Sequence, residues 1–311
     1  MSNNDCDVVI VGGGIAGLTA ALVSARAGRQ TRVLTGPALG GQLISIERID
    51  GYPGFPDGIP GYELCPIVQE HAVAAGAEFS AAAATNLTLH EGRWSVTSRE
   101  GEVHAGAVVI ASGTSSKELG IPGEERLRGK GVSHCASCDG PLLRSRTVGV
   151  VGGGDSALQE ALTLTQHVSR VIILHRGASL SGQAAYRDPV LRHDKIEVRT
   201  HTVVEEVLGE VGLTGVRTST TTDGSRSDVE LAALFVYIGL APNTAWLNET
   251  LELDASGRIP TDDRMRTRRP GLFAAGTVRS GSAGRAASAG GDGATAAVAA
   301  DQYLSDGAWR V

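Results

Sequence analysis

The sequence has few cysteines, no excess of basic side chains and no long apolar run. Four cysteines in 311 residues do not make a disulfide framework, so in a reducing cytosol a close pair among them is expected to be catalytic or metal-binding. A formal net charge of −6 argues against a nucleic-acid or anionic-membrane surface. No apolar stretch approaches the ~20 residues of a spanning helix, and the start MSNNDCDVVIV lacks the basic flank and cleavage pattern of a signal peptide. We therefore expect a cytoplasmic protein with neither a nucleic-acid nor a membrane partner.

Length and composition predict a globular protein with two cores. A chain of 311 residues is long enough for two domains, at roughly 100–200 residues each. Apolar residues make up 41% and charged residues 20%, both ordinary values. The 42 glycines lie among apolar Val, Ile and Leu runs, so we expect them to serve tight turns and close approach of a cofactor.

The chain contains an internal repeat. Residues 7–22 read DVVIVGGGIAGLTAAL, and residues 147–162 read TVGVVGGGDSALQEAL, at a constant offset of 140. Each copy has a β-branched run, a glycine turn and an apolar pattern of period 3.6, which predicts strand, turn and helix. A parallel strand must follow by a right-handed crossover, and RVL (32–34) and RVIIL (170–174) fit that place. The expected fold is α/β, with two Rossmann-like dinucleotide-binding domains.

The second repeat is predicted to be inserted into the first. Residues 117–244 would form the inserted domain, and residues 1–116 and 245–311 the discontinuous one. Further elements are predicted from the apolar pattern and the turn residues. They are strands at 107–111, 232–237 and 271–276, an antiparallel pair at 93–99 and 102–107 around Gly101, and an Ala-rich helix at 286–304.

The two glycine turns have the context of dinucleotide sites. A G-x-G-x-x-G turn lets the backbone approach a pyrophosphate, whose charge then meets free N–H groups at a helix start. The alternative is a tight turn that holds no ligand. At the tip of the strand after the second turn, His175 and Arg176 favour a 2′-phosphate and therefore NADP(H). At the corresponding tip after the first turn, Thr35 stands where an acidic residue would bind the ribose diol, so the ribose contact there is not identified.

Cys135-Ala136-Ser137-Cys138 is a C-x-x-C motif. Two intervening residues let the thiols close a disulfide, and a helix start can lower the pKa of one thiol. The alternatives are two structural cysteines or half of a zinc site, for which His134 is adjacent but no second ligand pair exists. Asp139 is a candidate proton shuttle, or a helix N-cap. Cys6 and Cys65 are isolated, and we expect no redox role for them.

Together these residues resemble the low-molecular-weight (bacterial-type) thioredoxin reductases among the FAD/pyridine-nucleotide-disulfide oxidoreductases. The flavoprotein subunit of alkyl hydroperoxide reductase is a near relative of that family. The resemblance runs from Val8 to Leu304, and the place of the C-x-x-C just before the second glycine motif is specific to it. It is carried by GGGIAG (12–17), GGQL (40–43), YPGFPDGIPGYEL (52–64), ASGT (111–114), LGIPGEERLRGKGVSHCASCDG (119–140), GGGDSALQEAL (152–162), IGLAPNT (238–244) and RRPGLFAAG (268–276).

The resemblance implies a function and a mechanism. NADPH at the second repeat would reduce FAD at the first, and the flavin would reduce the Cys135–Cys138 disulfide. Cys138 would lie beside the flavin ring, Cys135 would attack the partner disulfide, and Asp139 would be the acid. The partner would be a thioredoxin-like protein or a small-molecule disulfide or dithiol, and the enzyme a homodimer with no metal.

The resemblance also implies which residues contact the cofactors. The FAD-binding domain would be 1–116 with 245–311, and the NAD(P)H-binding domain 117–244. Residues expected at FAD are Gly12, Gly14, Ile15, Ala16, Gly17, Gly40, Gly41, Gln42, Leu43, Ala111, Gly113, Gly276, Thr277, Arg285 and Ala286. Residues expected at the nicotinamide nucleotide are Gly152, Gly154, Asp155, Ser156, His175 and Arg176.

The sequence departs from the family pattern at several of these places. The HRR-x-x-x-R phosphate motif reads HRGASLS (175–181) and keeps one of its three arginines, although Arg187 is a substitute candidate. The AAGD motif ends in Thr277, the Arg-Gln that follows falls on Gly284-Arg285, and an Asn becomes Gly51. NADH, or no nicotinamide at all, therefore stays open as an alternative to NADPH.

These departures keep two further functions open. The first is a ferredoxin-linked or O₂-dependent dithiol/disulfide oxidoreductase of the same fold. The second is a nucleotide- or redox-sensing binding protein without catalysis, against which the intact C-x-x-C argues.

Overall fold

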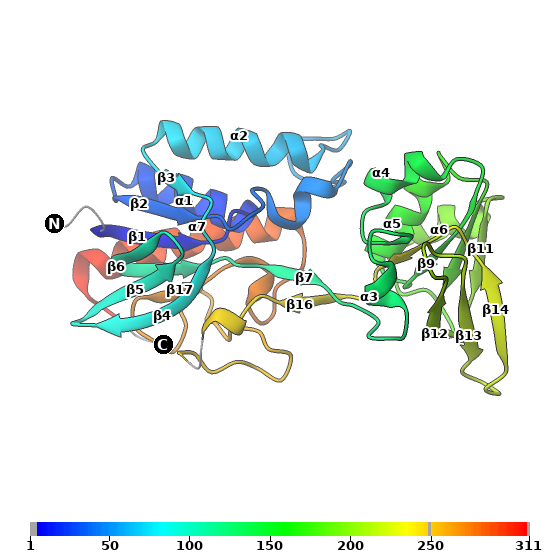
Figure 1. Ribbon diagram of the computed structural model, residues 1–311. Coiled ribbons are helices and arrows are strands. Elements are labelled where there is room, and N and C mark those ends of the chain that lie inside the picture. The colour runs from blue at the N-terminus through cyan, green and yellow to red at the C-terminus, as the bar shows by residue number, and fades with distance from the viewer. Residues whose placement is uncertain (1–4, 248–249, 310–311) are drawn as a thin grey trace. The chain divides into compact units, whose positions relative to one another are not determined.

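The computed structural model describes residues 5–247 and 250–309. The chain divides into two compact units: the first joins the residues up to Ser115 with those from Ala241 on, and the second runs from Ser116 to Leu240 (Figure 1). The chain passes from one unit to the other twice, through β7 (Thr114–Ser116) and β16 (Leu240–Pro242), and these strands pair with each other. In sequence, the second unit therefore lies between the two parts of the first.

The first unit is built on a mixed sheet with strand order β3-β2-β1-β6-β5-β4, and β17 pairs with β6 as well. The pairs β3–β2, β2–β1, β1–β6 and β6–β17 are parallel, whereas β6–β5 and β5–β4 are antiparallel. The strands are β1 (Asp5–Val11), β2 (Thr31–Leu34), β3 (Glu78–Ser80), β4 (Ala84–His90), β5 (Arg93–Ser98), β6 (Gly101–Ile110) and β17 (Leu272–Ala274).

The apolar run at residues 8–11 of β1 is explained by what covers the strand. Val8 and Ile10 pack into one core cluster with the alanines of the helices, and Val9 and Val11 pack into a second cluster on the other face. Side chains alternate between the faces of a strand, and both faces of this one are covered.

Three long helices belong to the first unit: α1 (Ile15–Arg26), α2 (Gly61–Ala74) and α7 (Ala286–Asp306). α7 is rich in Ala and Gly because it approaches α1 closely: a Cβ at Gly293 would lie 2.1 Å from the carbonyl oxygen of Ala16. Within residues 5–247 and 250–309, no helix is both long enough and apolar enough to cross a membrane.

The second unit contains a parallel sheet with strand order β11-β10-β9-β15-β8 and a separate antiparallel sheet β12-β13-β14. Its strands are β8 (Val132–Ser133), β9 (Thr147–Val151), β10 (Arg170–Leu174), β11 (Ile196–Arg199), β12 (Thr202–Leu208), β13 (Gly215–Thr220), β14 (Arg226–Glu230) and β15 (Ala233–Val236). Its helices are α3 (Glu124–Leu127), α4 (Ala136–Asp139), α5 (Asp155–Leu164) and α6 (Ala184–Arg192).

Short 3₁₀ turns complete the fold at η1 (Gly41–Ser45), η2 (Gly140–Leu143), η3 (Ala245–Leu247) and η4 (Gly276–Val278). The predicted antiparallel pair around Gly101 is confirmed, since Ser98 lies opposite Gly101. The strands expected separately at 102–107 and 107–111 are one strand, β6. Its first part pairs with β5 and its later part with β1, so one continuous strand joins the antiparallel and the parallel parts of the sheet.

Candidate functional site

The first glycine turn connects β1 to α1 and excludes larger residues at two positions. Gly12 has φ +120, and a Cβ there would lie 2.1 Å from the carbonyl oxygen of Ala111 at the end of β6. A Cβ at Gly17 would lie 1.9 Å from the carbonyl oxygen of Gly12. Both contacts are with backbone, which cannot move aside, so the turn requires glycine at these two places.

Gly14, by contrast, faces open space. No heavy atom lies within 4 Å of a Cβ built there, and Gly14 is the N-cap of α1 without any side-chain capping bond. Ile15, Ala16 and Gly17 form the first turn of the helix, whose leading N–H groups have no intrahelical acceptors. The open side and these N–H groups fit the diphosphate of a dinucleotide such as FAD.

The loop at residues 40–43 lies against the same turn. The N–H of Gly40 donates to the carbonyl oxygen of Gly13 (2.9 Å), and a Cβ at Gly41 would lie 3.3 Å from the Cα of Gly14. The Nε2 of Gln42 donates to the carbonyl oxygen of Thr114 (2.8 Å), and Leu43 packs on the adjoining core. The structure thus brings this predicted loop to the first glycine turn.

The Gly276–Thr277 turn also reaches this region. Thr277 Oγ1 lies 3.2 Å from Thr114 Oγ1 and 3.7 Å from a Cβ built at Gly113. A Cβ at Gly276 would lie 2.9 Å from the Cβ of Ala16 on α1. The hydroxyl of Thr277 therefore stands beside the predicted FAD contacts.

Asp292 on α7 fixes this turn, and the sequence analysis missed it. Its Oδ2 accepts the N–H of Gly276 (3.1 Å), and its carboxylate pairs with Arg279 at 2.7 Å with both side chains at most 17% exposed. The sequence signal for Asp292 is a carboxylate within a stretch that is otherwise rich in Ala and Gly. Arg285 and Ala286 lie at the start of the same helix, as its N-cap and first residue.

The second glycine turn repeats the geometry of the first. Gly152 has φ +141, and a Cβ there would lie 2.3 Å from the carbonyl oxygen of Tyr237 at the end of β15. Gly154 is open, since the nearest atom to a Cβ there is Ser181 Oγ at 4.0 Å. Asp155 and the exposed Ser156 begin α5 beside it. This turn therefore also fits a dinucleotide diphosphate.

Each turn is covered by the residue at the tip of the next strand. A Cβ at Gly13 would lie 2.8 Å from the Cβ of Thr35, and a Cβ at Gly153 would lie 2.4 Å from Nδ1 of His175. These two pairs obey the same offset of 140 as the sequence repeat. The Nε2 of His175 lies 3.0 Å from the carbonyl oxygen of Ser179, which holds the ring over the turn.

At the same strand tip, the side chain of Arg176 is exposed, and Arg187 on α6 lies 3.6 Å from Asp188. Arg176, a predicted site residue, thus has its side chain exposed at the strand tip that follows the second glycine turn.

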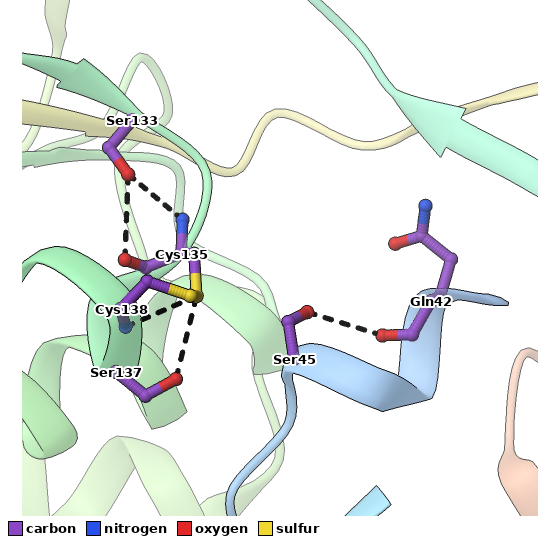
Figure 2. Close-up of a disulfide and its surroundings, with 6 residues drawn as sticks. All are labelled: Gln42, Ser45, Ser133, Cys135, Ser137 and Cys138. Atoms are coloured by element: carbon purple, nitrogen blue, oxygen red, sulfur yellow. Dashed lines mark hydrogen bonds between the residues drawn. A yellow bond between two sulfur atoms is a disulfide. The ribbon is translucent and has the colours of Figure 1, made fainter. Parts of the chain in front are cut away.

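Cys135 and Cys138 form a disulfide, with their Cα atoms 5.3 Å apart (Figure 2). Cys135 is the N-cap of α4, and its Sγ accepts the N–H of Cys138 (3.2 Å) and lies 3.5 Å from the Ser137 hydroxyl. The Ser133 hydroxyl accepts the N–H of Cys135 (3.1 Å). Cys138 is exposed and Cys135 half-buried. The pair is therefore within reach of a reactant and supplied with hydrogen-bond donors.

The neighbours of the pair have defined places. His134 Nδ1 lies 2.9 Å from the carbonyl oxygen of Val236, so this ring is held by β15. Asp139 is half-buried, and its carboxylate makes no capping hydrogen bond to η2. Asp139 thus occupies the N-cap position of η2, where the alternative interpretation places it, but without a side-chain capping bond.

The two isolated cysteines are free and buried, away from the pair in sequence. Burial raises the pKa of the Cys6 thiol to about 12 and that of Cys65 to about 11. Both side chains are therefore thiols rather than thiolates at neutral pH.

Comparison with known proteins gives matches along nearly the whole chain. The family model described as pyridine nucleotide-disulphide oxidoreductase matches residues 6–300. The thioredoxin reductase of Treponema pallidum is 39% identical over 300 residues, covering 96% of this chain and 97% of that protein. The bifunctional thioredoxin reductase/thioredoxin of Mycobacterium leprae is 36% identical over 96% of this chain and 66% of that protein. The crystal structure of Lactococcus lactis thioredoxin reductase matches with a TM-score of 0.94 at 34% identity, covering 97% of this chain and 99% of that one.

Proposed function

Because this chain belongs to the pyridine nucleotide-disulphide oxidoreductase family, in which it is a disulfide reductase that uses FAD and NADPH, we propose that it reduces thioredoxin through Cys135 and Cys138. The closed disulfide at the start of α4 is the observation that carries this proposal. The thioredoxin fused to the Mycobacterium leprae relative supports the choice of partner. A ferredoxin-linked or O₂-dependent oxidoreductase is less well supported, since relatives matched over 94–97% of their length are named thioredoxin reductases.

The residues of the site divide into two cofactor regions and the pair. The open backbone at Gly14 and the loop 40–43 are proposed to hold FAD, and the open backbone at Gly154 with Arg176 is proposed to hold NADPH. When bound, the two cofactors supply the electron pair that opens the Cys135–Cys138 disulfide.

The reduced pair then carries out thiol–disulfide exchange. The Cys135 thiolate attacks one sulfur of the partner disulfide, forms a mixed disulfide and releases the partner's first thiolate. Cys138 attacks the sulfur of Cys135, closes the protein disulfide and releases the second thiolate. Two electrons pass to the partner, and two protons end on its thiols, with Asp139 proposed to move one of them. The N–H of Cys138 and the Ser137 hydroxyl beside Cys135 Sγ support its role as the thiolate.

The partner surface is proposed to include the residues that follow the pair. Leu142 in η2 is 82% exposed, four positions after Cys138. An exposed apolar side chain beside a reactive disulfide suits contact with the apolar surface around a protein disulfide. A homodimer in the cytoplasm is part of the same proposal and is supported by the family resemblance.

Anaerobic titration of the purified, FAD-loaded protein tests the function. We expect NADPH to bleach the flavin absorbance and the reduced enzyme to reduce thioredoxin disulfide. Cys138→Ser should lose thioredoxin reduction by about 10³-fold or more, as loss of a covalent catalyst does, and should keep flavin reduction by NADPH. Cys6→Ser, at a buried cysteine of the other unit, is the matched control and should keep turnover. Unchanged thioredoxin turnover in the Cys138 variant would refute the role of the pair.

A further inference from the structure

The segment that leads into α6 is held on the second glycine turn. The N–H groups of Ser181 and Gly182 both donate to the carbonyl oxygen of Gly153, at 2.8 and 2.9 Å. The Ser181 hydroxyl donates to the same oxygen at 3.2 Å, so three donors share this one acceptor. The next residue, Gln183, is the N-cap of α6. The three bonds therefore fix the place of Gln183 relative to the turn.

Gln183 binds the carboxylate of Asp155, which is the first residue of α5. The N–H of Gln183 donates to Oδ1 of Asp155 (2.7 Å), and its side-chain Nε2 donates to Oδ2 (2.6 Å). Each oxygen of the carboxylate thus accepts a hydrogen bond from the same residue. Gly182 leaves room for this contact, since a Cβ there would lie only 3.3 Å from Oδ1. The carboxylate is therefore held at the start of α6.

The helices that follow the two glycine turns differ in charge at their starts. α1 begins with Ile15 and has no acidic residue in its first turn, whereas α5 begins with Asp155. The diphosphate proposed at each turn is an anion that would meet the N–H groups at the helix start. A carboxylate at a helix start is attracted by the same N–H groups, and it repels a second anion. The charge of Asp155 therefore opposes the proposed diphosphate unless another group holds the carboxylate.

We infer that Gln183 is a positioning residue for binding of the nicotinamide nucleotide. Its two donors hold the Asp155 carboxylate toward α6. The carboxylate then does not compete with the diphosphate for the N–H groups of Ser156 and Ala157, which have no acceptor within α5. This inference rests on the proposed NADPH site at the second glycine turn.

Gln183→Met tests the inference, because it removes the Nε2 donor and keeps the length of the side chain. Isothermal titration calorimetry of the oxidised, FAD-loaded protein measures binding of NADP⁺ and of adenosine 2′-monophosphate, which has no diphosphate. We expect NADP⁺ to bind about fivefold more weakly, since a hydrogen bond to a charged group is lost, and adenosine 2′-monophosphate to bind as in the wild type. Gln166→Met, at an exposed glutamine just after α5, is the matched control and should bind both ligands normally.

Asp155→Asn tests the charge, and it keeps the idea testable even if the glutamine variant folds poorly. It should tighten NADP⁺ binding about threefold, because a negative charge leaves the helix start. In this background, Gln183→Met should have little further effect. Unchanged NADP⁺ affinity in Gln183→Met, an equal loss for adenosine 2′-monophosphate, a full loss without the carboxylate, or unchanged or weaker NADP⁺ binding in Asp155→Asn would each overturn the inference. Failure of the proposed function is a different result: the wild-type protein would not bind NADP⁺, or it would not reduce thioredoxin.

Discussion

The four cysteines fall into two chemical classes because of where each side chain lies. Cys138 is exposed at α4, whereas Cys6 and Cys65 are 4% and 0% exposed, and burial raises their pKa values to about 12 and about 11. Since only the thiolate reacts with disulfide reagents, a raised pKa suppresses reaction at every pH below it.

Thiol counting should separate these classes. After anaerobic reduction and removal of the reductant, the native protein at pH 8 should show two rapidly reacting thiols, and four in denaturant. Raising the pH to 9 should not make the thiols of Cys6 and Cys65 react, because their raised pKa values still lie well above pH 9. Ellman's reagent measures the count. Four fast thiols in the native protein would contradict the burial of Cys6 and Cys65.

Arg176 is the residue on which the preference for NADPH over NADH should depend. Arg176→Ala removes a charge-assisted contact to the 2′-phosphate and should raise the KM for NADPH about tenfold, with little change for NADH. Steady-state kinetics with both nucleotides measure the change. Arg187→Ala is the control: its guanidinium already lies near Asp188, and we expect a smaller effect. A larger rise of the KM for NADPH in Arg187→Ala than in Arg176→Ala would show that Arg187 on α6 contacts the 2′-phosphate instead.

At the scale of single residues, the sequence predicts the cysteine pair and the glycine turns because spacing alone defines them. The role of Asp292 in the site cannot be predicted from the sequence, because its carboxylate contacts the N–H of Gly276 only when α7 packs against η4. Which way a side chain points is decided by packing between elements, and the sequence pattern does not contain that information.

In the first strand–turn–helix element, one glycine is required by the fold and a neighbouring one is proposed to serve cofactor binding. Gly12 has no room for a side chain, whereas Gly14 has open space and a φ of −76 that alanine adopts without strain. A substitution at the first position therefore tests folding, and one at the second tests binding.

Gly14→Ala should leave the unfolding free energy of the FAD-free protein unchanged within about 1 kcal/mol and weaken FAD binding about tenfold or more, because its methyl group obstructs hydrogen bonds to the diphosphate. Flavin fluorescence titration and urea unfolding measure the two quantities. Gly291→Ala, at an exposed position of α7 with open space around it, is the control. It should lower neither the unfolding free energy nor the affinity for FAD. Gly12→Ala should yield little folded protein. Normal FAD affinity in Gly14→Ala would show that the diphosphate of FAD does not bind at this turn.

At the scale of elements, the two βαβ units are predictable because their strands are buried on both faces and a glycine turn precedes each helix. The sheet β12-β13-β14 has no such signal. Its strands mix buried valines with exposed or half-exposed polar side chains, and ion pairs of Arg217 with Glu206 and Asp228 join them across the surface. The sequence pattern predicts two strands where the structure has β6 alone, because the change of partner from β5 to β1 has no signal in a run of small and apolar residues.

The whole molecule has separate cores in its two units. The clusters around β1 and α1 use residues of the first unit only, and those around β9 and α5 use residues of the second only. All three tryptophans, at positions 94, 246 and 309, belong to the first unit. Tryptophan fluorescence is therefore a selective probe of that unit.

Leu158→Ala should destabilise only the second unit. Leu158 is 0% exposed in its core, so the loss should be about 3 kcal/mol. In urea, circular dichroism should show an earlier transition, while the tryptophan midpoint and the bound FAD stay as in the wild type. Leu18→Ala, at an equally buried site on α1, should move the tryptophan transition instead. A common shift of both probes in either variant would show that the units unfold together.

The insertion has a consequence for the order in which the protein can be completed during translation. β17 pairs with β6, and α7 covers α1, so the first unit needs residues that leave the ribosome last. The inserted unit is fully synthesised before Ala241 appears, and at about 5–20 residues per second the helix α7 follows it by several seconds. During that interval a nascent chain carries a complete second unit next to an incomplete first unit. A polypeptide truncated in its last fifth would therefore display the uncovered apolar side of α1 to chaperones and proteases.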